Sequence, residues 1–119
     1  MKTFLAIYTG SAQSHARSDW DALDEGERNR RIKVGFDAWV AWGERHKDAI
    51  VAQGGPLGKT KRTDTSGVSD TVNALTGYVI VRAPTHEAAA RLFEGHPHFM
   101  IFPGESVANM ECLPLPQIS

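Results

Sequence analysis

The chain has 119 residues, of which 41% are hydrophobic and 23% are charged, with a formal net charge of −1 and a single cysteine, Cys112. These values predict one globular domain over residues 1–119 and argue against nucleic-acid or anionic-membrane binding, because no basic field is present to hold phosphates. No apolar run is long enough to cross a bilayer. A lone thiol and a start without a signal-peptide pattern indicate the cytoplasm.

Thr3 to Thr9 is predicted to form the first strand. Alternation divides its apolar side chains between two faces, with Phe4, Ala6 and Tyr8 on one and Leu5 and Ile7 on the other. A strand that is apolar on both faces is normally covered on both faces. In a chain of this length we expect its own helices to cover one face and a second subunit to cover the other.

A polar loop is expected over residues 10–17, followed by a helix from Ser18, its predicted N-cap, to about Ile50, with a break near Gly26. The helical spacing predicts an amphipathic stripe facing a core. Its members are Ile32, Phe36, Trp39, Val40 and Gly43, flanked by Trp42 and His46.

Three further strands and a second helix follow. The strands are predicted over residues 50–57, with a glycine bulge at Gly54, over 75–83 and over 106–113. Residues 58–66 indicate a polar hairpin or flap, with residues 68–74 as the other arm. The second helix begins at the N-cap Thr85, buries Ala88, Ala89, Leu92 and Phe93, and ends at Gly95. An apolar loop is expected over residues 99–104, and Cys112 is expected to be an inert core thiol in the last strand.

This order of elements favours an α+β domain with a ferredoxin-like antiparallel sheet and helices on one face. The other face of the sheet is then bare. On the pattern of Phe4, Ala6, Tyr8, Val79 and Val81 we expect it to be apolar. Because large apolar patches are rarely left in water, we predict a homodimer through this face, forming a barrel-like core with one pocket per subunit.

Several short motifs resemble the YCII-related family (YciI-like, DGPF-type) of dimeric α+β barrels. The matching segments cover the last two-thirds of the chain: residues 54–57, 75–78, 87–89, 97–98, 104–107 and 113–114. The resemblance implies the ferredoxin-like fold and a homodimer, and little about reaction. A His-Asp pair of some members corresponds here to Trp39 and His96, so that pair is not carried over. Related barrels include isomerases and dehalogenating enzymes of aromatic breakdown.

The segment Gly95-His96-Pro97-His98 carries the candidate catalytic groups. His98 is proposed as a general acid/base, because imidazole titrates near neutral pH. The alternative is a turn residue whose ring bonds a backbone carbonyl. His96 is the second catalytic candidate, with a surface position as its alternative. If the backbone were extended here, both rings would share a face and bind a metal, with a third ligand from His46, His86, Glu105 or Glu111. We assign neither a metal nor a cofactor.

Trp39, Trp42 and Tyr8 are the predicted walls of a substrate pocket, with core packing as the alternative for both tryptophans. The first hypothesis is therefore a small enzyme that binds a compact aromatic or lactone-like metabolite, with His98 moving a proton. The second is a non-catalytic ligand-binding or accessory module that uses the same pocket. A cationic segment, residues 59–62, predicts either closure over an anionic ligand or, by default, a charged hairpin tip.

Overall fold

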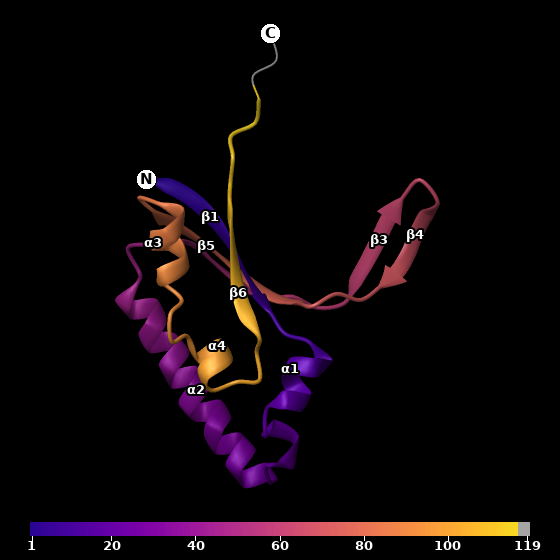
Figure 1. Cartoon of the computed structure of the whole chain (residues 1–119), viewed down its shortest axis with the longest axis vertical. Coiled ribbons are helices and arrows are strands. Elements are labelled where there is room, and N and C mark those ends of the chain that lie inside the picture. The colour runs from indigo at the N-terminus through magenta and orange to yellow at the C-terminus, as the bar shows by residue number, and fades with distance from the viewer. Residues whose placement is uncertain (117–119) are drawn as a thin grey trace.

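The structure, a computed structural model, describes residues 1–116. In chain order (Figure 1) its elements are β1 (Lys2–Thr9), α1 (Ala12–Arg17), η1 (Trp20–Ala22), α2 (Glu25–Arg45), β2 (Ile50–Pro56), β3 (Thr60–Asp64), β4 (Gly67–Thr71), β5 (Leu75–Ala83), α3 (His86–Arg91), α4 (Pro97–Met100) and β6 (Ser106–Glu111).

Four strands form one antiparallel sheet in the order β2-β5-β1-β6. Each of the two outer strands is reached by a helical crossover that passes a central strand: α2 joins β1 to β2, and α3 with α4 joins β5 to β6. This is the ferredoxin-like order, and the predicted fold class is confirmed.

The core lies between the sheet and its helices. Phe4 and Val81 are opposite each other in β1 and β5 and are fully buried, and Trp42 of α2 and Ala89 of α3 pack against them. Helix α2 and helix α3 therefore cover the same face of the sheet. Residues directly opposite each other in a ladder share a face of the sheet. The side chains that point toward the helices are therefore those of Phe4, Ala6, Tyr8, Val79 and Val81.

The prediction was wrong about which residues form the bare face, since it took Phe4, Ala6, Tyr8, Val79 and Val81 as representatives of that face. Those side chains are the helix-covered core. The side chains on the opposite face are Leu5, Ile7, Tyr78, Ile80 and Met110, as the pairing of β1 with β5 and β6 requires. The period-two alternation was read correctly, but alternation alone does not say which side the helices take.

Helix boundaries near the N-terminus also differ from the prediction. The expected loop contains α1, which begins at a capping box in which Ser11 and Ser14 each bond the backbone N–H of the other. Ser18 ends α1 rather than starting the long helix. The N-cap of α2 is Asp24, whose side chain accepts the Glu27 N–H at 2.7 Å, and the helix stops at Arg45.

The amphipathic stripe predicted on α2 is rotated from the face that the helix buries. Phe36 and Val40 are 66% and 63% exposed, whereas Gly35 and Trp42 are buried. The helix approaches the loop after α4 at Gly35, where a Cβ atom would overlap the Phe102 ring. Close approach at Gly35 brings this side of α2 inward, and the spacing of apolar residues along the helix does not show where a distant segment packs so closely.

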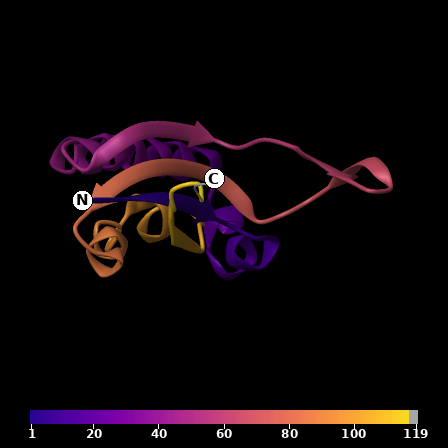
Figure 2. The same ribbon diagram turned by 90° about the horizontal axis from the view of Figure 1, so that it is seen from above.

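The hairpin, the bulge in β2 and the cap of α3 agree with the prediction. β3 and β4 form a separate two-stranded hairpin that projects away from the sheet (Figures 1 and 2). Its cations are paired within the hairpin, Lys61 with Asp70 and Arg62 with Asp64, as in a charged hairpin tip. The pairing of β2 with β5 shifts register beside Gly54, whose φ is 63°, so the predicted bulge is confirmed. Thr85 caps α3.

Two predictions for the C-terminal third are wrong. Residues 97–100 form a short helix, α4, because Pro97 suits the first helical position and the His96 side chain caps it. The loop expected from residue 99 therefore begins only after Met100. Cys112 is an exposed free thiol beyond the last residue of β6, not a core residue. Within residues 1–116 no helix is both long and apolar enough to span a bilayer.

Candidate functional site

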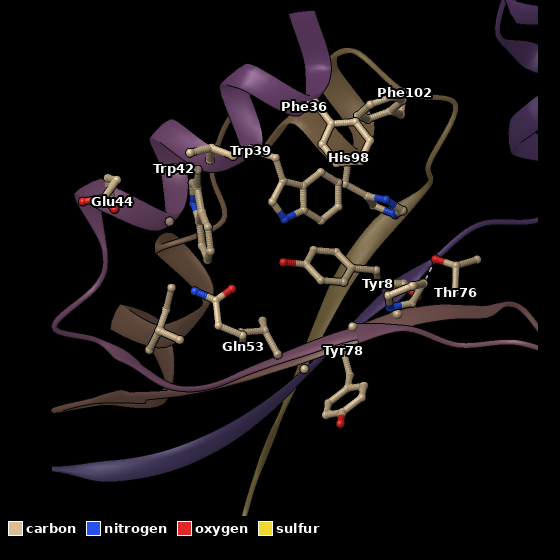
Figure 3. Close-up of a pocket in the computed structure, with 18 of the residues that line it drawn as sticks. Tyr8, Phe36, Trp39, Trp42, Glu44, Gln53, Thr76, Tyr78, His98 and Phe102 are labelled. Atoms are coloured by element: carbon tan, nitrogen blue, oxygen red, sulfur yellow. Dashed lines mark hydrogen bonds between the residues drawn. The ribbon is translucent and has the colours of Figure 1, made fainter. Parts of the chain in front are cut away.

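A pocket of about 580 Å³ lies on the helix-covered side of the sheet, bounded by α2, β2, β5 and α4 (Figure 3). It is walled mainly by aromatic side chains and glycine backbone. The lining residues that matter for its chemistry are Tyr8, Phe36, Trp39, Trp42, Gln53 and His98. The bulge at Gly54 shapes one wall, since a Cβ atom there would overlap the Tyr78 carbonyl.

Four of the five predicted site residues line this pocket. Tyr8 projects from the central strand β1, Trp39 and Trp42 from the inner side of α2, and His98 from α4. The Tyr8 ring lies 5.0 Å from Trp39 and 5.2 Å from His98, centroid to centroid. The fifth, His96, is not among the lining residues and packs behind Tyr8 at a centroid distance of 5.2 Å.

His98 is held in place by its neighbours as well as facing the pocket. Its Nε2 lies 2.7 Å from the Thr9 carbonyl oxygen, and because a carbonyl only accepts, Nε2 carries the hydrogen. Gly104 packs so closely on the ring that a Cβ atom there would overlap it. Burial lowers the pKa of His98, partly opposed by the carbonyls of Thr9 and Ser106, so the neutral ring is favoured.

His96 is fully buried, so its expected surface position is wrong. It caps α4: its Nδ1 accepts the backbone N–H of His98 at 3.0 Å, and its Nε2 lies 3.4 Å from the Tyr8 hydroxyl oxygen. Trp39 and Trp42 contact its ring edge-on, at centroid distances of 4.5 and 4.7 Å. Burial lowers its pKa to about 4, with smaller contributions from the charges of His98 and His46.

The metal-binding alternative does not match this geometry. It required His96 and His98 on extended backbone, but α4 is helical there, and their nitrogens bond the His98 N–H, Tyr8 and Thr9. Of the proposed third ligands, His86 and Glu111 lie 3.5 Å apart beside Phe4, at another place in the fold. Across residues 1–116, no three or more His, Cys, Asp or Glu residues gather as metal ligands.

Sequence reasoning did not assign most of the lining residues to a pocket, among them Phe36, Gln53 and Phe102. Phe36 was assigned to the core, Phe102 to a loop, and Gln53 was not considered although it adjoins the predicted bulge. A usable signal existed for Gln53, because a polar residue next to a backbone irregularity in an otherwise apolar strand is typical of a site. No local signal places Phe102, which packs on α2 at Gly35 and beside Trp39.

Comparison with solved structures gives one informative neighbour. It is the 5-chloro-2-hydroxyhydroquinone dehydrochlorinase (TftG) from Burkholderia phenoliruptrix AC1100, in complex with 2,5-dihydroxybenzoquinone. The match covers 91% of this chain and 90% of the neighbour, with a TM-score of 0.52 and 19% sequence identity. The two proteins share a fold. At this identity the comparison supports the α+β architecture and nothing finer.

Comparisons by sequence add no assignment: no family model matches the chain. No curated protein matches it either. The YCII-related resemblance therefore depends on the short motifs quoted above and on the fold.

Proposed function

We propose that this chain is a YCII-related protein that binds a small aromatic or lactone-like metabolite in the pocket beside Tyr8 and His98. The observation that carries the proposal is the pocket itself, whose volume of about 580 Å³ lies in the range of small-molecule sites, roughly 300–1,000 Å³. The dihydroxybenzoquinone held by the structural neighbour has the same flat, ring-shaped chemistry.

The walls favour a flat ring. Trp39 and Tyr8 meet at an interplanar angle of 52°, and Phe102 lies 6.1 Å from Trp39, so aromatic faces and edges surround the space. Ring–ring contacts of this kind add about 0.5–1.5 kcal/mol per pair beyond burial of area. Gln53 is the polar side chain on the β2 side of the pocket, and it supplies a hydrogen-bonding group for orientation.

His98 is the proposed acid–base group. Because its Nε2–H donates to Thr9, the neutral ring carries no hydrogen on Nδ1. Nδ1 is the nitrogen that we propose accepts a proton from a ligand. The lowered pKa keeps the ring in this basic form at neutral pH. A ligand with an acidic C–H beside a carbonyl is the matching substrate class, and no metal or organic cofactor is part of the proposal.

A non-catalytic binding module is the second candidate, and one observation favours it. The contacts of His98 with Thr9 and Gly104 are those expected of a residue that closes the junction between α4 and β6. A structural histidine of this kind needs no proton transfer. The two candidates differ in what replacement of His98 by glutamine does, because glutamine can preserve a hydrogen bond but cannot act as a base near neutral pH.

The first test uses 2,5-dihydroxybenzoquinone as the probe. We expect the wild-type protein to bind it and to accelerate exchange of its ring hydrogens with D₂O, followed by NMR. In that exchange a base removes a proton from the keto tautomer and deuterium returns to the same carbon. His98→Gln is expected to retain binding and to lose the acceleration by a factor of roughly 10²–10⁴, the usual contribution of a general base.

The matched control is His15→Gln, which changes a histidine of α1 that does not line the pocket. It should leave both binding and exchange unchanged. Binding without acceleration in the wild-type protein would support the non-catalytic module. Absence of binding by the probe and by other small ring compounds, measured by titration and thermal shift, would contradict the proposed function itself.

We also propose that the chain works in the cytoplasm, where its exposed thiol stays reduced.

We further propose that the chain is a homodimer through the bare face of the sheet. Leu5, Ile7, Ile80 and Met110 give this face an apolar centre on three adjacent strands. Met110 is 45% exposed, Leu5 and Ile80 are half-buried, and Ile7 is nearly closed off, so the face is an apolar patch that is partly open to solvent. Such a patch is typical of an interface.

Sedimentation velocity tests the dimer. The wild-type chain is expected to sediment as a dimer and Ile80→Lys as a folded monomer, because a lysine in the centre of the interface leaves a buried charge unpaired. Val72→Lys is the control, since Val72 is 93% exposed beyond the end of β4. A wild-type monomer, or a dimer that Ile80→Lys leaves intact, would rule out this interface.

A further inference from the structure

A directional hydrogen-bond chain runs from the backbone of α4 to the pocket. It starts at the backbone N–H of His98, which can only donate, and its acceptor is Nδ1 of His96 at 3.0 Å. His96 is fully buried among aromatic rings, where the neutral imidazole is favoured. A neutral imidazole whose Nδ1 accepts carries its one hydrogen on Nε2, so the tautomer of His96 is fixed by the backbone.

The next link is the Tyr8 hydroxyl, 3.4 Å from Nε2 of His96. Since Nε2 carries the hydrogen, it donates to the Tyr8 oxygen, and the Tyr8 hydrogen must point to another acceptor. Among residues 1–116 the structure gives this hydroxyl no second hydrogen-bond partner. Figure 3 shows it directed toward the side of the pocket formed by Trp42 and Gln53.

Tyr8 therefore differs from an ordinary tyrosine in a pocket wall, which can either donate or accept. The side chain is 5% exposed, and burial raises its pKa far above the neutral range, so it stays protonated. The link to His96 occupies its acceptor side. What remains for a ligand is an O–H donor with a fixed direction, and linked donors of this kind polarise one another.

We propose that Tyr8 selects ligands with an oxygen acceptor, a ring or lactone carbonyl or a phenolate, and that His96 is the positioning residue that makes Tyr8 a donor. This rests on the proposed function, because it assumes that the pocket is the binding site. Ligands that present only a donor at this position, such as an N–H or ammonium group, are disfavoured, since two hydrogens would face each other. Ligands without a polar atom there leave a buried hydroxyl unpaired.

A pair of ring compounds that differ by one carbonyl tests the selection. Phthalide has a lactone carbonyl, and phthalan has a methylene group in its place. We expect phthalide to bind the wild-type protein on the order of tenfold to a hundredfold more tightly than phthalan, the effect of one satisfied buried donor. Tyr8→Phe, which removes only the hydroxyl, should reduce this ratio to about one.

The outcomes separate the two proposals. Equal affinities in the wild-type protein, no binding of phthalide while dihydroxybenzoquinone binds, or a ratio that survives Tyr8→Phe would each overturn the selection and leave the pocket assignment standing. If no ring compound binds at all, the proposed function fails, and the selection by Tyr8 fails with it.

The role of His96 has a readout that a merely structural role would not give. Long-range ¹H–¹⁵N NMR of the histidine rings is expected to show His96 as a neutral Nε2–H tautomer, and an Nδ1–H tautomer would overturn the proposal. His96→Asn supplies a second measurement, because asparagine is a good helix N-cap but is too short to reach Tyr8. It should lower the phthalide-to-phthalan ratio while phthalan affinity stays unchanged; an unaltered ratio would contradict the role.

Discussion

Replacing Trp42 with alanine is expected to lower the free energy of unfolding by about 3–5 kcal/mol. The indole is 3% exposed, packs against Phe93 and His96, and donates its N–H to the Leu92 carbonyl at 2.8 Å. Its removal opens a cavity between α2 and the segment after α3 and leaves that carbonyl without its donor. Urea denaturation measures the loss.

Trp42→Phe keeps one aromatic ring in the core, removes the N–H that bonds Leu92 and leaves a smaller cavity than Trp42→Ala does. It should cost about 1–3 kcal/mol. Val40→Ala is the control on the same helix, since Val40 is 63% exposed, and its effect should stay within about 0.5 kcal/mol. A loss from Trp42→Ala no larger than that of the control would show that Trp42 is not a core residue.

Acidification is expected to destabilise the protein through His96. Burial lowers the pKa of His96 from 6.5 to about 4 in the folded protein, whereas the unfolded chain binds a proton near the ordinary value. The contribution of neutral His96 is therefore fully present above pH 6.5, is lost progressively as the pH falls toward 4, and is constant below that. A shift of this size corresponds to about 3 kcal/mol.

The matched comparison is the pH dependence of unfolding in His96→Asn. Removing His96 should reduce the steepness of the wild-type curve between pH 6.5 and about 4. Some dependence remains, because burial also lowers the pKa values of His46 and His98. Denaturant unfolding at several pH values provides the measurement, and identical curves for the two proteins would contradict a neutral, buried His96.

Local chemistry in the sequence was sufficient for several elements. The β-branched alternation of residues 75–83 predicted β5, the Thr85 cap predicted the start of α3, and the Gly54 bulge was predicted from its glycines. Each depends on backbone preferences or capping groups within a few residues. The same local signals were misleading at Ser18, because Ser11 and Asp24 offered competing caps that the sequence does not rank.

The sequence by itself determined the order of the four sheet strands and of the two helical connections between them, and therefore a ferredoxin-like sheet. It also singled out the histidine segment and the aromatic residues Tyr8, Trp39 and Trp42, which lie around one pocket. Only the tertiary structure decided which face of the sheet the helices cover, that His96 is buried behind Tyr8, and that Gln53 and Phe102 join the pocket. Those outcomes depend on close approaches between distant segments, at Gly35 and Gly104 above all, and on competition between faces of similar hydrophobicity. A local pattern contains neither.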